Sequence, residues 1–176
     1  MCIKRQLYDS ALRHGGRLGS KFSYRIYGKG FKEDSNQDPV TKGEAWDHWS
    51  SGRGGFRIDG KLDNSDSLTF QGEFSENRNR SNVGIVSLAD LNLENVDDLE
   101  DVRGSYLQGR WERQFDSGSK LAVQAYYSHY DRDAEHWFKE SEDSFDLEFH
   151  HLFKAGEQHP IVWGGDLRWL DRRSKA

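Results

Sequence analysis

The sequence predicts an all-β fold, an antiparallel up-and-down meander of about eight strands. Apolar and polar residues alternate with a period of two, which is the spacing of side chains on the two faces of a strand. Turn signals separate the alternating segments, and 18 glycines against two prolines suit sheet and turn. The connections are alternately short and long, which places all tight turns at one end of the meander.

The clearest pair of strands lies at residues 106–131. In the first arm Leu107 and Trp111 lie on one apolar face. In the second arm Val123 lies on the apolar face. Polar residues occupy the alternate positions of the first arm. The arms join at residues 116–119, where Gly118 supplies the positive φ that a short hairpin turn needs.

The remaining segments are assigned in order along the chain. Further strands are predicted at residues 7–14, 22–29, 54–62, 68–75, 145–153 and 161–169. Short turns are predicted at residues 15–19, 63–66 and 155–158, and longer polar connections at residues 32–52, 77–103 and 132–142. Residues 85–99 offer a turn or two of helix within the second long connection.

Composition limits the classes of function. The net charge of −5 and the isoelectric point near 5.8 argue against a nucleic-acid partner. The single cysteine, Cys2, rules out an internal disulfide. The sequence holds no nucleophile–base motif, no phosphate-binding glycine loop and no sheltered pair of carboxylates, so we predict that the chain is not an enzyme and expect no cofactor.

The alternating pattern has two structural readings. In a soluble sandwich or barrel the apolar face is the core, whereas in a membrane barrel it meets lipid and the polar face lines a wet interior. Strands of about ten residues match a tilted crossing of the hydrocarbon layer. Phe145 and Phe153 lie on one face about 26 Å apart along a strand, near the spacing of aromatic girdles. These features and the turn–loop asymmetry favour a transmembrane β-barrel.

Four segments of the sequence can be compared with known families: GGRLGSKFSYRIYGKGFKED, GRGGFRIDGKLDNSDSLTFQGEF, GRWERQFDSGSKLAVQAYYSHYDRD and DSFDLEFHHLFKAGEQHPIVWGGDLRW. Together they resemble consecutive strands of TonB-dependent outer-membrane receptors. The resemblance covers about residues 12–172, in the order of the family, and is greatest to the early barrel strands that follow the plug domain.

The resemblance implies a 22-stranded barrel with an N-terminal plug, which takes up iron–siderophore complexes, cobalamin or similar scarce ligands with energy from an inner-membrane TonB–ExbB–ExbD complex. It implies the outer membrane of a Gram-negative cell, with membrane lipid and a siderophore-like small molecule as partners. Residues 1–176 match only part of that barrel domain. We therefore expect a fragment that lacks the plug, the TonB box and the later strands, and that reaches the TonB complex only through those regions.

Candidate ligand contacts lie in the predicted long connections. They are the aromatic and histidine residues Trp46, His48, Trp49, His136 and Trp137. Exposed aromatic residues on loops are enriched at binding surfaces, and the alternative is that each loop packs on itself. No ligand-binding residue is carried over from the family, because binding loops differ between receptors.

A metal site is not predicted. The acidic residues of the second long connection start like a calcium loop, but Asn95 replaces the glycine and no flanking helices are evident, so we interpret them as a solvated loop. His150 and His151 are adjacent on a strand and point to opposite faces.

Two alternative functions remain open. One is a complete small outer-membrane barrel with a structural or adhesive role, because eight strands are just enough to close one. The other is a soluble β-barrel or sandwich that binds a small ligand. The surroundings of the apolar face distinguish them: Trp111, Phe149, Trp163 and Trp169 are buried in the soluble case and exposed to detergent in the membrane case.

Overall fold

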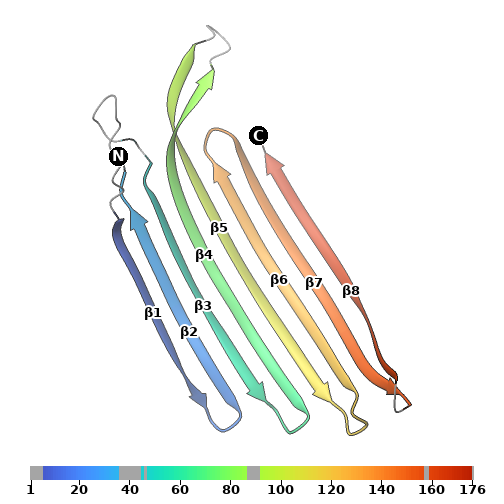
Figure 1. Ribbon diagram of the computed structural model, residues 1–176. Coiled ribbons are helices and arrows are strands. Elements are labelled where there is room, and N and C mark those ends of the chain that lie inside the picture. The colour runs from blue at the N-terminus through green and yellow to red at the C-terminus, as the bar shows by residue number, and fades with distance from the viewer. Residues whose placement is uncertain (1–5, 36–44, 46, 87–91, 157–158, 176) are drawn as a thin grey trace.

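The computed structural model describes residues 6–35, 45, 47–86, 92–156 and 159–175, which form one antiparallel sheet. Its strands pair in chain order and number eight: β1 (Gln6–Leu18), β2 (Phe22–Glu33), β3 (Trp49–Lys61), β4 (Asp66–Val86), β5 (Leu93–Gln114), β6 (Lys120–Ala134), β7 (Phe138–Ala155) and β8 (His159–Lys175). Figure 1 shows them side by side in a single layer, with β1 and β8 at opposite edges. The predicted all-β meander is confirmed.

Four tight connections lie at one end of the sheet (Figure 1). Three of them contain a glycine with positive φ: Gly19 at 66°, Gly118 at 79° and Gly156 at 74°. Residues other than glycine are strained at positive φ. The glycines therefore determine where the chain turns in these three hairpins. The assignment of Gly118 from the sequence is therefore confirmed.

The fourth tight turn, between β3 and β4, uses an aspartate instead of a glycine. Asp63 Oδ1 accepts hydrogen bonds from the backbone N–H groups of Ser65 and Asp66, both at 2.7 Å. This is the pattern by which an Asp side chain mimics a backbone turn. The two N–H groups lower the pKa of Asp63, because they stabilise its ionised form.

The prediction of a long connection at residues 77–103 was wrong. The described residues of the segment 85–99, for which a turn or two of helix was expected, belong to strands, except for residue 92 beside them. β4 and β5 pair without a break from Asn77↔Val102 to Val86↔Leu93, leaving only residues 87–92 between the strands. Cross-strand ion pairs accommodate the polar composition: Arg78–Asp101 at 2.8 Å and Arg80–Asp97 at 2.9 Å. In Figure 1 this charged ribbon extends beyond the neighbouring strands.

The predicted loop at residues 132–142 is also mostly strand, since only residues 135–137 connect β6 to β7. Complementary charges face each other here, with Asp133 opposite Lys139 and a Lys139 Nζ–Asp133 Oδ2 distance of 2.6 Å. The Arg132 guanidinium lies 4.9 Å from the centre of the Phe138 ring. The far end of the sheet therefore has two longer connections, at residues 34–48 and 87–92, instead of three.

The first turn was predicted too early in the chain, at residues 15–19. In the structure β1 continues to Leu18, and the turn lies at residues 19–21. Gly15 and Gly16 belong to β1, opposite Arg25 and Tyr24. A Cβ atom on Gly16 would lie 3.0 Å from the Tyr24 ring, so the absence of a side chain there lets an aromatic ring cover the strand. Gly15 and Gly16 allow Tyr24 to lie close to the β1 backbone, whereas Gly19 forms the turn.

The sheet has almost no core. Ala134, at 5% exposure, is the single buried hydrophobic residue of the described chain, and no described side chain is fully buried. Large apolar side chains stay open, including Leu167 at 64% and Trp169 at 54% exposure. One layer of sheet cannot cover its own apolar face, so that face requires an apolar environment from outside the described residues.

We expect Asp63→Ala to loosen the turn between β3 and β4, because it removes the acceptor of two backbone N–H groups. NMR shifts of the Ser65 and Asp66 amide protons measure this change. The contribution of Asp63 to the stability of the folded turn is present above the pKa of about 3.9 that the group has in the unfolded chain. This contribution is lost as the pH falls through the lowered pKa of the folded state.

Asp63→Asn is the matched control, because it keeps the acceptor oxygen and does not titrate. It should retain the native amide shifts at neutral pH and show no change in acid. An acid transition that persists in the Asn variant would contradict the role given to Asp63.

Candidate functional site

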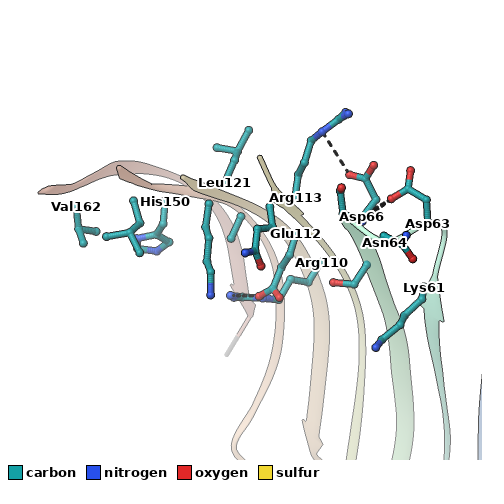
Figure 2. Close-up of a pocket in the computed structure, with 16 residues that line it drawn as sticks. Lys61, Asp63, Asn64, Asp66, Arg110, Glu112, Arg113, Leu121, His150 and Val162 are labelled. Carbon is teal, nitrogen blue, oxygen red and sulfur yellow. Dashed lines mark hydrogen bonds and ion pairs between the residues drawn. The ribbon is translucent and has the colours of Figure 1, made fainter. Parts of the chain in front are cut away.

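The two faces of the sheet differ in chemistry and in curvature. Figure 2 shows the ribbon arching over Arg110 and Glu112, whereas Arg113 and Leu121 lie on its outer side. Side chains alternate along each strand, and the register between strands is known. These four residues therefore determine the face on which each of the remaining strand residues lies. The outer, convex face is apolar over most of its height, and the inner, concave face is polar.

The apolar band of the convex face crosses all eight strands. It includes Leu12, Ile26, Phe56, Phe70, Leu107, Trp111, Val123, Tyr127, Phe145, Leu147, Phe149, Trp163, Leu167 and Trp169. Three aromatic residues, Tyr127, Phe145 and Trp169, are opposite one another on β6, β7 and β8 and form a row at one border.

A second group of rings lies on the same face toward the tight turns. Phe149 and Trp163 pack edge to face with centroids 5.2 Å apart, and Trp163 Nε1 donates to His151 Nδ1 at 3.1 Å. Phe153 lies near the turn, eight residues from Phe145. At ~3.3 Å per residue the two aromatic borders of β7 are about 26 Å apart along the strand.

Immediately beyond the aromatic row the convex face becomes charged. Ion pairs cross neighbouring strands or run along one: Arg103–Glu76 at 3.2 Å, Arg78–Asp101 at 2.8 Å, Lys139–Asp133 at 2.6 Å and Arg173–Asp171 at 2.6 Å. We call this the ion-pair belt. On β6, β7 and β8 the side chains of this face change from aromatic to charged or histidine within two residues: Tyr127 is followed by His129, Phe145 is preceded by Asp143, and Trp169 is followed by Asp171.

His129 occupies the first row of the belt and lies between two carboxylates. Its Nδ1 is 2.8 Å from Asp143 Oδ1, and its Nε2 is 2.7 Å from Asp131 Oδ2. The hydrogen bond to Asp143, followed by the one to Asp131, raises the pKa of His129 above its usual 6.5. The pKa of Asp131 is lowered by hydrogen bonds from Ser141 and His129. The arrangement therefore favours a charged imidazolium.

The concave face carries a network of polar side chains in the middle of the sheet. Asp59 accepts from Arg57 at 2.8 Å and from Thr69 at 2.9 Å, and Gln71 donates to Gln108 at 2.7 Å. Tyr106 and Tyr126 stack with centroids 5.6 Å apart. The four arginines on this face of β5 to β8 are paired: Arg110–Glu112, Arg132–Glu100, Arg168–Asp146 and Arg172–Glu142. These groups have the composition of a hydrated wall.

A hollow of roughly 520 Å³ opens on the concave face near the tight turns (Figure 2). Its lining on the concave face combines both signs of charge: Lys61, Arg110, Glu112, Lys120 and His150. Within the described residues no group of three or more His, Cys, Asp or Glu side chains is placed to hold a metal ion. The hollow therefore offers hydrogen-bonding groups but no described catalytic constellation.

The structure separates the predicted ligand contacts into two places at the far end of the sheet. Trp49 is the first residue of β3 and not part of a loop; it packs edge to face on Phe31 at 4.4 Å and donates from Nε1 to Glu33 at 2.6 Å. His48 Nδ1 lies 3.4 Å from Ser35 Oγ. Trp46 lies outside the described residues. The sequence analysis did not identify Phe31 as a member of this aromatic group. Phe31 lies on the polar face, where a single aromatic residue produces no periodic pattern.

His136 and Trp137 lie in the connection between β6 and β7. His136 Nδ1 is 3.1 Å from Asp98, a carboxylate that is only 7% exposed, and Trp137 is 52% exposed. β4 and β5 lie between β3 and β6, so this pair is about 14 Å from Trp49 at ~4.8 Å per strand. The two groups share one rim of the sheet but do not touch.

The acidic residues that start like a calcium loop do not converge on one point in the described part of the chain; they are Asp90, Asn92, Glu94, Asp97, Asp98 and Asp101. Asp97 pairs with Arg80, Asp98 with His136 and Asp101 with Arg78, and Asp97 and Asp98 point to opposite faces of β5. Asp90 lies outside the described residues.

Comparison with protein-family models, curated proteins and solved structures finds no match to this chain. No helix in the described part of the chain is long and apolar enough to cross a membrane.

We expect the imidazole of His129 to titrate above pH 6.5, because both neighbouring carboxylates stabilise its charged form. Its contribution to stability is complete below its unfolded pKa of about 6.5 and is lost as the pH rises through the raised folded pKa. Histidine NMR titration of the folded chain measures the midpoint. Asp143→Asn should lower it, whereas Asp166→Asn, a carboxylate on the opposite face, should not. A His129 midpoint at or below 6.5 would contradict this assignment.

Proposed function

We propose that this chain forms part of the wall of a transmembrane β-barrel in a bacterial outer membrane, with its convex face against lipid. The observation that carries the proposal is the direction of curvature relative to polarity. The sheet bends toward its polar face, so the apolar face is on the outside (Figure 2). A soluble barrel has the opposite arrangement, with apolar side chains inside.

The dimensions of the apolar band support the same conclusion. The band is bordered by aromatic residues about 26 Å apart along β7, and tilted barrel strands carry an apolar band about 25 Å tall between two aromatic girdles. The ion-pair belt begins immediately beyond the aromatic row of Tyr127, Phe145 and Trp169. Charged side chains in that position lie at the level of lipid headgroups or beyond.

The connections support an orientation across the membrane. The tight turns at one end have the form of periplasmic turns, and the longer β2–β3 connection and the projecting β4–β5 ribbon at the other have the form of external loops (Figure 1). The candidate ligand contacts Trp49 and Trp137 then lie at the external end.

The edges favour a large barrel over a closed eight-stranded one. In the described chain β1 pairs only with β2, and β8 pairs only with β7. Free strand edges cannot remain in lipid, because their backbone groups have no water to bind. A barrel that contains this wall therefore needs further strands between β8 and β1. The resembling phrases fall on consecutive strands from β1 to β8, and we propose a TonB-dependent receptor that takes up iron–siderophore complexes or similar scarce ligands.

Tryptophan fluorescence tests the lipid contact. We expect a variant that keeps only Trp169 of the six tryptophans to be quenched by brominated lipid in vesicles, since this ring lies in the aromatic row of the convex face. A variant that keeps only Trp137, in the β6–β7 connection, is the matched control and should not be quenched. If Trp169 is shielded from both lipid and water, the apolar face is covered by protein and the soluble alternative is correct.

Arginine substitutions on neighbouring residues test which face meets lipid. Val123 lies in the apolar band, and Ala122 lies on the concave face opposite Glu112. Val123→Arg should weaken vesicle binding by about 2–4 kcal/mol, roughly 30- to 700-fold, whereas Ala122→Arg should change it little. Co-flotation of the folded chain with vesicles measures both. Equal losses in the two variants would show that the faces are not distinguished by lipid.

A further inference from the structure

The concave face of β1, β2 and β3 carries a concentration of basic side chains, which we call the basic strip. It consists of Arg13, Arg17, Arg25, Lys29, Arg53 and Arg57. Arg57 lies in register with Gln71 and Gln108, and Gln108 shares the face of Arg110 on β5. The whole strip therefore lines the same concave surface as the groups drawn in Figure 2.

Like charges face each other directly within the strip. Arg25 is opposite Arg57 on the β2–β3 pair, and Lys29 is opposite Arg53. Directly opposed like charges destabilise a strand pair. The two opposed pairs are four residues apart along β2, about 13 Å at ~3.3 Å per residue. Two sites of concentrated positive charge thus follow each other along the concave face of the β2–β3 pair.

Acidic side chains neutralise only part of the strip. Lys29 lies 3.7 Å from Asp9, and Arg57 lies 2.8 Å from Asp59. Among the described residues Arg13, Arg17, Arg25 and Arg53 have no direct ion pair. Arg25 has a longer-range charge interaction with Asp59, the carboxylate that Arg57 already binds. Arg25 Nε is in addition shielded from solvent and has no hydrogen-bond partner. A shielded guanidinium nitrogen without an acceptor is uncommon, because leaving it unsatisfied is unfavourable.

On the other half of the same face, β5 to β8, each of the four arginines is paired with a carboxylate, so the contrast between paired and unpaired arginines is internal to the sheet. On β5 to β8 Arg110 pairs with Glu112, and Arg172 pairs with both Glu140 and Glu142. A general need for a charged, hydrated wall would affect both halves alike. The chain as a whole is negative, at −5, so the strip is also a local exception to its overall charge.

We propose that the basic strip binds a multivalent oxyanion, a small molecule with at least two phosphate or carboxylate groups. One anionic group lies between Arg25 and Arg57, and a second lies near Lys29 and Arg53. Arginine suits this role, because its planar guanidinium binds phosphate or carboxylate through two parallel hydrogen bonds. The anion supplies an acceptor to Arg25 Nε and removes the repulsion between the opposed cations. The assignment rests on the charges of the sheet and does not depend on the lipid contact of the opposite face.

Calorimetric titration of the folded full chain in detergent with inorganic tripolyphosphate tests the proposal. We expect saturable binding with one equivalent that weakens as salt is raised. The double variant Arg25→Gln/Arg53→Gln should lose at least tenfold in affinity. Its thermal midpoint should be unchanged or higher, because the substitutions remove repulsion and break no ion pair of the described residues.

The matched control is Arg110→Gln/Arg168→Gln, which removes the same charge from the same face at neutralised positions. It should keep tripolyphosphate affinity within twofold. Equal losses in the two double variants would show diffuse attraction to any cation and overturn the site, as would the absence of saturable binding. A glutamate-rich peptide that binds the strip more tightly than tripolyphosphate would overturn the small-molecule class in favour of a protein segment.

Discussion

The backbone hydrogen-bond ladder is the interaction on which this structure depends. In most domains two layers pack together and bury a core, but here a single layer of eight strands leaves Ala134 as the one buried hydrophobic residue of the described chain. Each inner strand is bonded on both sides through its backbone, and the register is continuous from β2 to β8. Lateral pairing therefore determines where every side chain lies, and the two faces inherit their chemistry from it.

The faces then need different environments. The convex face cannot be left in water, because its apolar band is continuous across the strands. The concave face cannot be left in an apolar medium, because every strand from β2 to β8 carries a guanidinium group, a carboxylate group or both on it. A sheet that separates lipid from a wet interior meets both requirements at once. This complementarity connects the proposed membrane wall with the proposed anion site on its inner surface.

The sequence predicted positions on faces better than it predicted where strands end. Alternation placed Trp111, Val123 and Phe149 on one face correctly, because the period of two depends only on local geometry. It failed at residues 77–103 and 132–142, where charged and polar residues dominate and no regular alternation is left. Those strands are held by pairs such as Arg78–Asp101 and Asp133–Lys139, whose partners are chosen by register across the sheet.

The sequence by itself determined the strand order, the tight-turn positions of Gly118 and Gly156, and the existence of one apolar and one polar face. These follow from local conformational preferences and from connections too short for any other pairing. Only the tertiary structure decided which face is convex, that Trp49 and His136 lie apart on one rim, and that Arg25 lies opposite Arg57. Curvature and register arise from all strands together, so no single segment encodes them.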